Sequence, residues 1–153
     1  MIRIGAISDT HGLLRPESVA ALEGVDHILH AGDVGADSIL DKLGDIAPLT
    51  AICGNVDLSG RCGALSPTEI VEVGGKVFYL VHSLLNLDIK PEVSAIDAVI
   101  CGHSHRPSIE HCRGVLYLNP GSAGPRRFEL PITMALIEIE DDRLSCRLIK
   151  IAQ

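Results

Sequence analysis

The sequence IRIGAISDTH, residues 2–11, joins a run of apolar residues to a short polar end. The run Ile2–Ser8 has the length and composition of a buried strand, and Asp9 and His11 follow it directly. Side chains just after a parallel strand lie in the crevice at the carboxyl edge of the sheet, where α/β proteins bind ligands. This stretch therefore predicts an α/β fold and the location of its functional site.

Four later apolar runs end in the same manner, at a glycine or directly at a side chain that binds metal well. The chain has seven histidines, and four of them stand at such ends, which chance does not easily produce. Carboxylate, amide and imidazole ligands suit a pair of first-row divalent metals. The runs are Ile28–Ala31 before Gly32-Asp33, Leu49–Cys53 before Gly54-Asn55, Val77–Val81 before His82, and Ala98–Cys101 before Gly102-His103-Ser104-His105. The candidate metal ligands are Asp9, His11, Asp33, Asn55, His82, His103 and His105.

The spacing of the candidate ligands along the chain is consistent with their side chains pointing into one pocket. Asp9 and His11 are two residues apart, as are His103 and His105. On an extended backbone, residues two apart point to the same side, so each pair can aim two ligands into one pocket. A glycine also precedes Asp33 and two other candidates, and it allows the backbone to bend sharply after the strand.

The first third of the chain alternates strands with helices. The strands are expected at Ile2–Ser8, His27–Ala31 and Leu49–Cys53. The helix Pro16–Leu22 begins at a proline, and the helix Asp37–Leu43 is expected to stop at the following glycine. This βαβαβ order predicts a parallel sheet.

From about residue 69 the pattern changes to hairpins. Two-residue turns are expected at Gly74-Gly75 and Arg113-Gly114, and a four-residue turn at 140–143. We therefore expect a two-sheet α/β sandwich with helices outside, in a single domain over residues 1–153. The predicted strands are Glu69–Val73, Lys76–Val81, Asp97–Cys101, Ser108–Cys112, Val115–Leu118, Thr133–Ile139 and Leu144–Ile151.

Composition narrows the class of protein. The 153 residues are 46% hydrophobic and 22% charged, as expected for an ordered domain with a large core. A net charge of −7 argues against an extended nucleic-acid or anionic-membrane surface, and no apolar run approaches the ~20 residues of a membrane span. The five cysteines lack a Cys-x-x-Cys pair, so we expect reduced thiols in a cytoplasmic protein.

The ordered motifs at the five strand ends resemble the signature of calcineurin-like metallophosphoesterases. The short length and the segment Asn119-Pro120-Gly121-Ser122, followed by Pro125-Arg126, resemble more narrowly its small bacterial and archaeal phosphodiesterase branch. The resemblance covers most of the chain, from Met1 to Arg127. It implies the same two-sheet fold and a metal-dependent phosphoesterase that favours phosphodiesters with aryl or nucleotide-like arms.

The resemblance also implies a division of labour between two metal ions. Asp33 bridges the ions, which share a hydroxide that attacks phosphorus in line with the leaving group. Asn55, His103 and Asp57 are the candidates for direct catalytic roles, although Asp57 also fits a turn residue. Manganese is the favoured metal, with iron, nickel and zinc open. The first ion is assigned to Asp9, His11, Asp33 and His105, and the second to Asp33, Asn55, His82 and His103.

The sequence departs from the wider family at two places. Many members follow the Gly-Asn pair with histidine as a general acid, but here Val56 follows it and cannot donate a proton. Many also have glycine after the ligand assigned to His82, where this chain has Ser83. His30 and the pair Arg126-Arg127 are each open to a supporting role at the site or a structural one.

Other functions are weighed against this one. A phosphomonoesterase would use the same site, and a retromer coat subunit uses the same fold as a protein-binding scaffold with a degraded metal set. The intact ligand set favours an enzyme. A purely structural metal site is disfavoured, because such sites prefer closed tetrahedral Cys and His shells. The expected partner is a small phosphoester, and self-association stays open.

Overall fold

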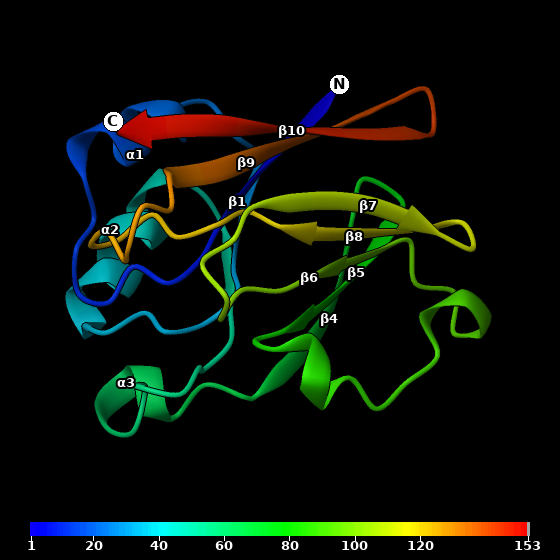
Figure 1. Ribbon diagram of the computed structural model, residues 1–153. Helices are drawn as coiled ribbons and strands as arrows, with labels where there is room; N and C mark the ends of the chain where they lie inside the picture. Colours follow the sequence, from blue (N-terminus) through cyan, green and yellow to red (C-terminus); the bar gives the residue numbers. More distant parts are fainter. Residues whose placement is uncertain (153) are drawn as a thin grey trace.

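Two five-stranded β-sheets pack face to face, and helices cover the outer side of the first sheet (Figure 1). The structure is a computed structural model and describes residues 1–152. The two-sheet α/β sandwich expected from the sequence is confirmed. In the described residues, no helix is long and apolar enough to cross a membrane.

The first sheet has the strand order β10-β9-β1-β2-β3. The strands β1, β2 and β3 run parallel, as the βαβαβ pattern predicts, and β9 pairs with β1 in the antiparallel direction. Each of the three parallel strands ends slightly before its predicted end, which leaves the candidate ligands on loops. The bounds are β1 Ile2–Ile7, β2 His27–His30, β3 Leu49–Ala51, β9 Ile132–Glu140 and β10 Arg143–Ala152.

The second sheet has the order β4-β5-β6-β8-β7 and differs from the expected run of hairpins. The hairpins β4–β5 and β7–β8 are present, but β6 runs parallel to both β5 and β8. The chain between β5 and β6 crosses the outer face of this sheet through two 3-10 turns, and Leu87 and Ile89 pack there. The bounds are β4 Thr68–Val73, β5 Lys76–Val81, β6 Ala98–Ile100, β7 Ser108–Cys112 and β8 Val115–Asn119, with the 3-10 turns η1 Leu84–Asn86 and η2 Pro91–Val93.

The helices are α1 (Pro16–Ala21), α2 (Asp37–Ile46) and α3 (Gly60–Gly63). The prediction that α2 stops at Gly44 is wrong, because the helix continues for two more residues. Pro48 terminates it instead: the residue before a proline is disfavoured in helical geometry, and Ala47 is extended with φ −162°. The short α3 was not expected from the sequence.

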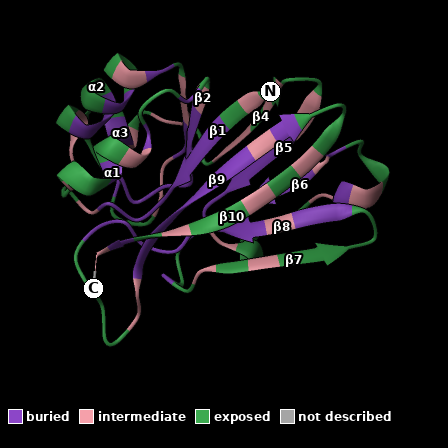
Figure 2. Ribbon diagram, turned by 90° about the horizontal axis from the view of Figure 1, so that it is seen from above, coloured by how far each residue is buried: buried purple, intermediate pink, exposed green. Residues whose placement is uncertain are grey.

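Alternate residues of β1 face different cores. Ile4 and Ala6 pack between the two sheets with Phe78, whereas Ile7 packs beneath the helices with Leu43. This period of two is the geometry of an extended strand that is buried on both sides. Figure 2 shows how burial varies across the fold: β9 is almost entirely buried, the edge strand β7 is largely exposed, and the edge strand β10 mixes exposed and half-buried residues.

The hairpin turns follow the predicted chemistry with one difference. Gly74 and Gly75 both have positive φ, as a two-residue turn of the primed type requires. The connection between β9 and β10 was expected to span four residues, but it is also a two-residue turn. Asp141 and Asp142 form it with φ of 52° and 63°, because short polar side chains tolerate the left-handed region.

The two phenylalanines give a matched test of the inter-sheet core. Phe78 is completely buried, and Phe128 is 86% exposed. Replacing Phe78 by alanine is expected to lower the free energy of unfolding by about 3–5 kcal/mol, through lost burial and the cavity left behind. Phe128→Ala is expected to change it by less than about 0.5 kcal/mol. Urea denaturation of both variants measures the difference, and similar losses would contradict this account of the core.

Candidate metal centre

The candidate ligands follow strands whose carboxyl ends meet at one edge of the sandwich. Asp9 and Asp33 follow β1 and β2, and His82 follows β5. His105 lies in the loop after β6, which the parallel arrangement of β5 and β6 brings to the same edge. The unexpected parallel pairing in the second sheet therefore helps to bring ligands from both sheets together.

Two carboxylates lie at the centre of this cluster. The Oδ2 atom of Asp33 is 3.5 Å from His11 Nε2 and 3.2 Å from His82 Nε2. The Oδ1 atom of Asp9 is 3.5 Å from His105 Nε2, 3.7 Å from His11 Nε2 and 3.8 Å from His82 Nε2. These atoms form two overlapping groups able to hold a metal ion. The groups are Asp9 with His11 and His105, and Asp9 with Asp33 and His82.

Several buried polar atoms in the cluster have no hydrogen-bond partner within residues 1–152. They are Asp9 Oδ1, His11 Nε2, His82 Nε2 and His105 Nδ1. The Nδ1–H group of His82 donates to the Ala31 carbonyl at 2.7 Å, so its Nε2 presents a lone pair to the carboxylates. Buried acceptors without donors are costly unless a cation satisfies them. The donor set therefore fits divalent metal ions.

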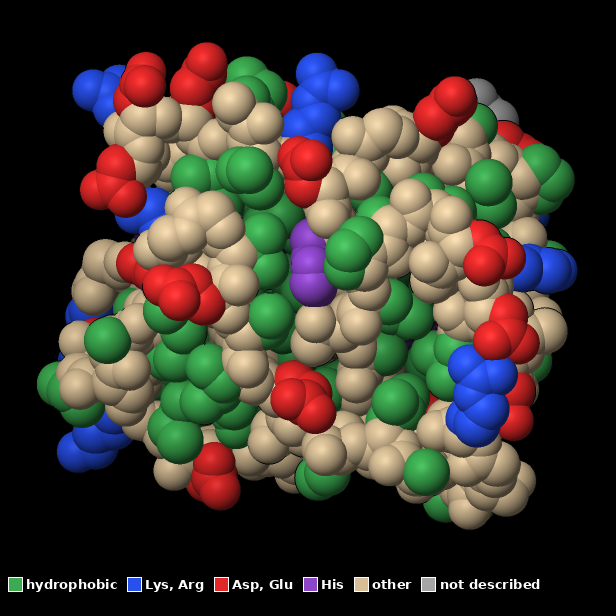
Figure 3. Space-filling view, turned by 180° about the vertical axis from the view of Figure 1, so that it is seen from behind, with side chains coloured by type: hydrophobic (Ala, Val, Ile, Leu, Met, Phe, Trp, Pro, Cys, Tyr) green, Lys and Arg blue, Asp and Glu red, His purple; other side chains and the backbone are tan. Residues whose placement is uncertain are grey.

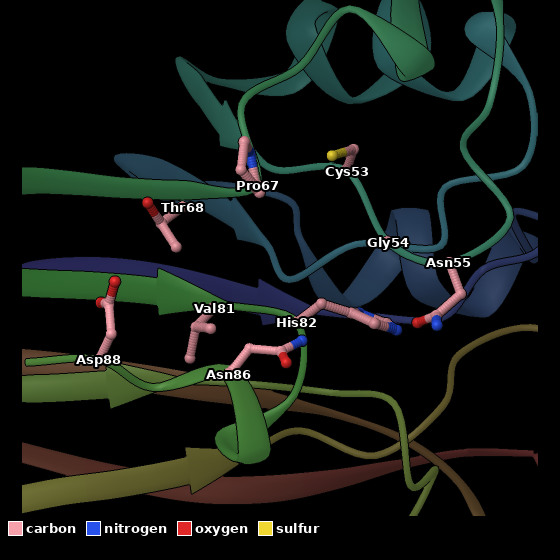
Figure 4. A pocket seen from close by; sticks show the side chains of 9 residues that line it. All are labelled: Cys53, Gly54, Asn55, Pro67, Thr68, Val81, His82, Asn86 and Asp88. Carbon is pink, nitrogen blue, oxygen red and sulfur yellow. The ribbon is translucent and has the colours of Figure 1, made fainter.

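Two of the seven candidates lie outside the two compact groups. The His103 ring is exposed, with its centroid 5.2 Å from that of His82, and its backbone N–H donates to Asp9 Oδ2. Asn55 is also exposed and lines the same pocket as His82 (Figure 4). The two compact groups share Asp9, whereas the division implied by the family assigns the bridging position to Asp33.

The chain matches the model of the calcineurin-like phosphoesterase superfamily domain over residues 2–142. The chain belongs to this superfamily. It is 37% identical to a probable metallophosphoesterase of Methanocaldococcus jannaschii, in an alignment that covers 98% of this chain and 82% of that protein. The relatives it matches include other archaeal and bacterial probable metallophosphoesterases.

Solved structures share the superfamily fold at lower sequence identity. A novel archaeal phosphodiesterase superposes with a TM-score of 0.80 at 23% identity, covering 97% of this chain and all of that one. Vps29 of Entamoeba histolytica in complex with zinc superposes with a TM-score of 0.73 at 20% identity, covering 99% of this chain and all of that one. The fold is thus common to a phosphodiesterase and to Vps29, and function must be argued from the site.

The candidate ligands in the loops after β1 and β6 do not lie on extended backbone. The alternation assumed for the Asp-x-His and His-x-His pairs is wrong, because all four residues have positive φ. Left-handed backbone is uncommon for residues other than glycine, costs about 1–3 kcal/mol at each position, and concentrates at functional sites. The φ values are 54° for Asp9, 46° for His11, 55° for Asp33, 69° for His103 and 63° for His105.

The glycines beside the ligands serve two purposes. Gly32 has φ 102°, so it makes the sharp bend that its position before Asp33 predicts. Gly102 has no such backbone, and a Cβ there would overlap the side chains of Ser8 and Asp9. Close approach between neighbouring loops therefore explains Gly102 better than bending does.

Burial and opposite charge set the protonation of the cluster. Burial opposes ionisation of Asp9, but the close approach of His105 and His11 and a hydrogen bond from Ser8 outweigh it, so the pKa of this carboxyl lies well below its usual range. Asp9 correspondingly raises the pKa of His11. In the metal-free protein the Asp9 carboxylate is charged, and a metal ion would compete with a proton for the His11 ring.

Asp57, a candidate for catalysis from the sequence, braces the two ligand loops. Its buried carboxylate accepts hydrogen bonds from the backbone N–H groups of Val34 at 3.1 Å, Gly35 at 3.0 Å and Gly54 at 2.8 Å. These amides lie beside Asp33 and Asn55. The geometry supports a positioning role for Asp57, with its oxygens already engaged.

His30 and Thr10 form a second brace. The Nδ1 atom of His30 accepts from Gly32 N–H at 3.1 Å, so its Nε2–H donates to Thr10 Oγ1 at 3.0 Å. The Thr10 hydroxyl then donates to the Val34 carbonyl at 2.8 Å. Burial lowers the pKa of His30 to about 4, which keeps the ring neutral. The sequence left the role of His30 open and gave no signal for Thr10.

The segment Asn119–Ser122 also supports the ligand loops. The side-chain amide of Asn119 donates to the Gly102 carbonyl at 3.0 Å, and the Ser122 hydroxyl donates to the Asp9 carbonyl at 3.0 Å. This gives a physical role to a motif that sequence analysis noted only as a resemblance. All five cysteines are free thiols, and neither compact group contains one.

The neutral state of His30 predicts a pH dependence of stability. Its pKa is about 6.5 in the unfolded chain and about 4 in the fold, so the unfolded state binds more protons between these values. The neutral His30 ring therefore makes its full contribution to the free energy of unfolding above pH 6.5. About 3 kcal/mol of that contribution is lost as the pH falls toward 4. Urea denaturation in EDTA measures this effect. Between pH 6.5 and pH 4, the free energy of unfolding should fall by about this amount more in wild type than in His30→Asn. Parallel profiles would contradict the depressed pKa.

The convergence of the ligands predicts two divalent ions per chain. Asp33 Oδ2 lies between His11 and His82, so Asp33→Asn is expected to lose most of the binding at both positions. Elemental analysis after reloading and gel filtration measures the stoichiometry, with Asp45→Asn on the exposed face of α2 as the charge-matched control. One ion or none in wild type would refute a dinuclear centre.

Proposed function

We propose that this protein is a dinuclear metal-dependent phosphodiesterase acting on small aryl or nucleotide-like phosphodiesters. The observation that carries the proposal is the convergence of two carboxylates and three imidazoles, several of whose buried polar atoms lack hydrogen-bond partners within residues 1–152. A closed structural zinc site would have used cysteine, and no cysteine takes part in either group. The loops from both sheets instead leave the cluster open to neighbouring pockets.

Two divalent ions, when bound, supply an activated water and neutralise the charge that develops on the phosphoryl oxygens. Manganese is the favoured metal. The Asp and His side chains of the two compact groups hold the ions, with Asp57 and His30 keeping their loops in place. In the proposal, the exposed side chains of Asn55 and His103 complete the second metal position and lie within reach of the bound phosphoryl group.

The position next to Asn55 has no proton donor. Val56 is 48% exposed, and its backbone N–H donates to Asp33 Oδ1 at 2.9 Å. Its side chain carries no group able to protonate a leaving oxygen. General acid catalysis typically contributes about 10²–10⁴-fold, so we propose that the enzyme depends on good leaving groups.

A phosphomonoesterase is the second candidate, and one observation favours it. Arg126 and Arg127 line a pocket of about 260 Å³ together with His11 and His105. Guanidinium groups bind the dianion of a monoester well. Comparison of mono- and diesters of one phenol separates the two activities. A protein-binding scaffold is less well supported, because the metal set is intact.

The proposed partner is a small molecule. On the face shown in Figure 3, lysine and arginine side chains are scattered among acidic and uncharged ones, in keeping with a net charge of −7. An extended nucleic acid needs clustered basic side chains along its path.

The leaving-group dependence tests this function. Substituted phenyl phosphodiesters are incubated with the manganese-loaded protein, and log rate is plotted against the pKa of the phenol. A steep negative slope is expected, and hydrolysis should stop at the monoester once the phenol is released. Val56→His should raise rates on poor leaving groups by up to about 10²-fold. A flat plot, with chemistry rate-limiting, would reveal a general acid. No turnover with manganese, iron, nickel or zinc would refute the proposed function.

A further inference from the structure

A second pocket adjoins the metal centre on the side of the second sheet. It has a volume of about 430 Å³, within the range of small-molecule sites. The His82 ring and the Asn55 amide lie at one end of it, and Thr68 and Asp88 lie toward the other (Figure 4). A group bound at the metal centre therefore has direct access to this space.

The polar groups of the pocket are free to bind a ligand. The side chains of Thr68, Asn86 and Asp88 make no hydrogen bond to any other residue in the described part of the chain, 1–152. Asp88 likewise forms no ion pair there. The lining contains no lysine or arginine, so beyond the metal-binding end its only charged group is the Asp88 carboxylate.

The opposite side of the metal centre carries the opposite charge. There Arg126 and Arg127 line the smaller pocket beside His11 and His105. The two pockets meet different members of the ligand cluster, His82 on one side and His11 on the other. A phosphoester at the centre thus lies between a basic pocket and an acidic one, and this polarity restricts how it binds.

We propose that the pocket of Thr68, Asn86 and Asp88 receives an organic arm of the phosphoester, and that Asp88 selects arms without negative charge and prefers a cationic arm such as an alkylammonium. The inference rests on the proposed phosphoesterase function and specifies its substrate class. A negatively charged arm is disfavoured there, because it meets Asp88 and has no cation of the lining to pair with.

Three 4-nitrophenyl phosphodiesters test the selection. Their second arms are choline, the uncharged 3,3-dimethylbutyl group of the same shape, and an anionic carboxypropyl group. In wild type, kcat/KM for the choline ester should exceed that for the dimethylbutyl ester by about threefold to fivefold, since an exposed ion pair contributes modestly in water. The carboxypropyl ester should be the poorest of the three.

Variants of Asp88 test whether this residue causes the preference for the choline ester. In Asp88→Asn the ratio of choline to dimethylbutyl ester should fall to about one, and in Asp88→Lys it should invert. Asp45→Asn removes the same charge from the exposed face of α2, outside the pocket, and should keep the wild-type ratio and activity. Inhibition constants of phosphocholine and 3,3-dimethylbutyl phosphate measure the same preference without turnover.

The outcomes separate the two proposals. Hydrolysis of all three esters with a ratio that Asp88→Asn does not change overturns the inference and leaves the phosphoesterase function intact. A preference for the carboxypropyl ester that Arg127→Gln abolishes places the arm in the basic pocket and also overturns it. Hydrolysis of none of the esters with any of the four metals overturns the function, and the inference with it.

Discussion

The charged carboxylate of Asp9, completely buried at the end of β1, is the interaction on which the site depends. One oxygen faces three imidazole nitrogens, and the other accepts the Ser8 hydroxyl and the His103 N–H. An ionised group without water is stable only when its surroundings are fixed in advance. The loops around it are accordingly tied down by hydrogen bonds.

Many of those bonds come from residues that are not themselves candidate metal ligands. Asp57 binds three amides of two loops, and the ring of His30 joins two loops through Thr10. Such braces stop paired carboxylates from moving apart under their mutual repulsion. The precision of the centre therefore comes from backbone contacts, and the ligand side chains alone do not explain it.

The sequence predicted most of what depends on local pattern. Strand alternation, glycine turns and the polar ends of apolar runs gave the two sheets and indicated one shared edge. The prediction failed where distant parts of the chain decide: the parallel position of β6 and the hydrogen bonds from Val34 and Gly35 to Asp57 join segments far apart in the sequence. The end of α2 was misplaced for a local reason, because Pro48 rather than Gly44 stops the helix. The extended spacing assumed for Asp9 and His11 was wrong, because close packing of loops sets their backbone.

The left-handed backbone of five ligands has a consequence for transplanting such a site. Ideal strands cannot present these side chains, so copying the residue types onto another sheet would not reproduce the centre. A designer would have to transfer the turns themselves, with Gly32 and Gly102 and the braces of Asp57 and His30. In this fold the site is defined by the backbone conformation of a set of loops, and the residue signature alone does not specify it.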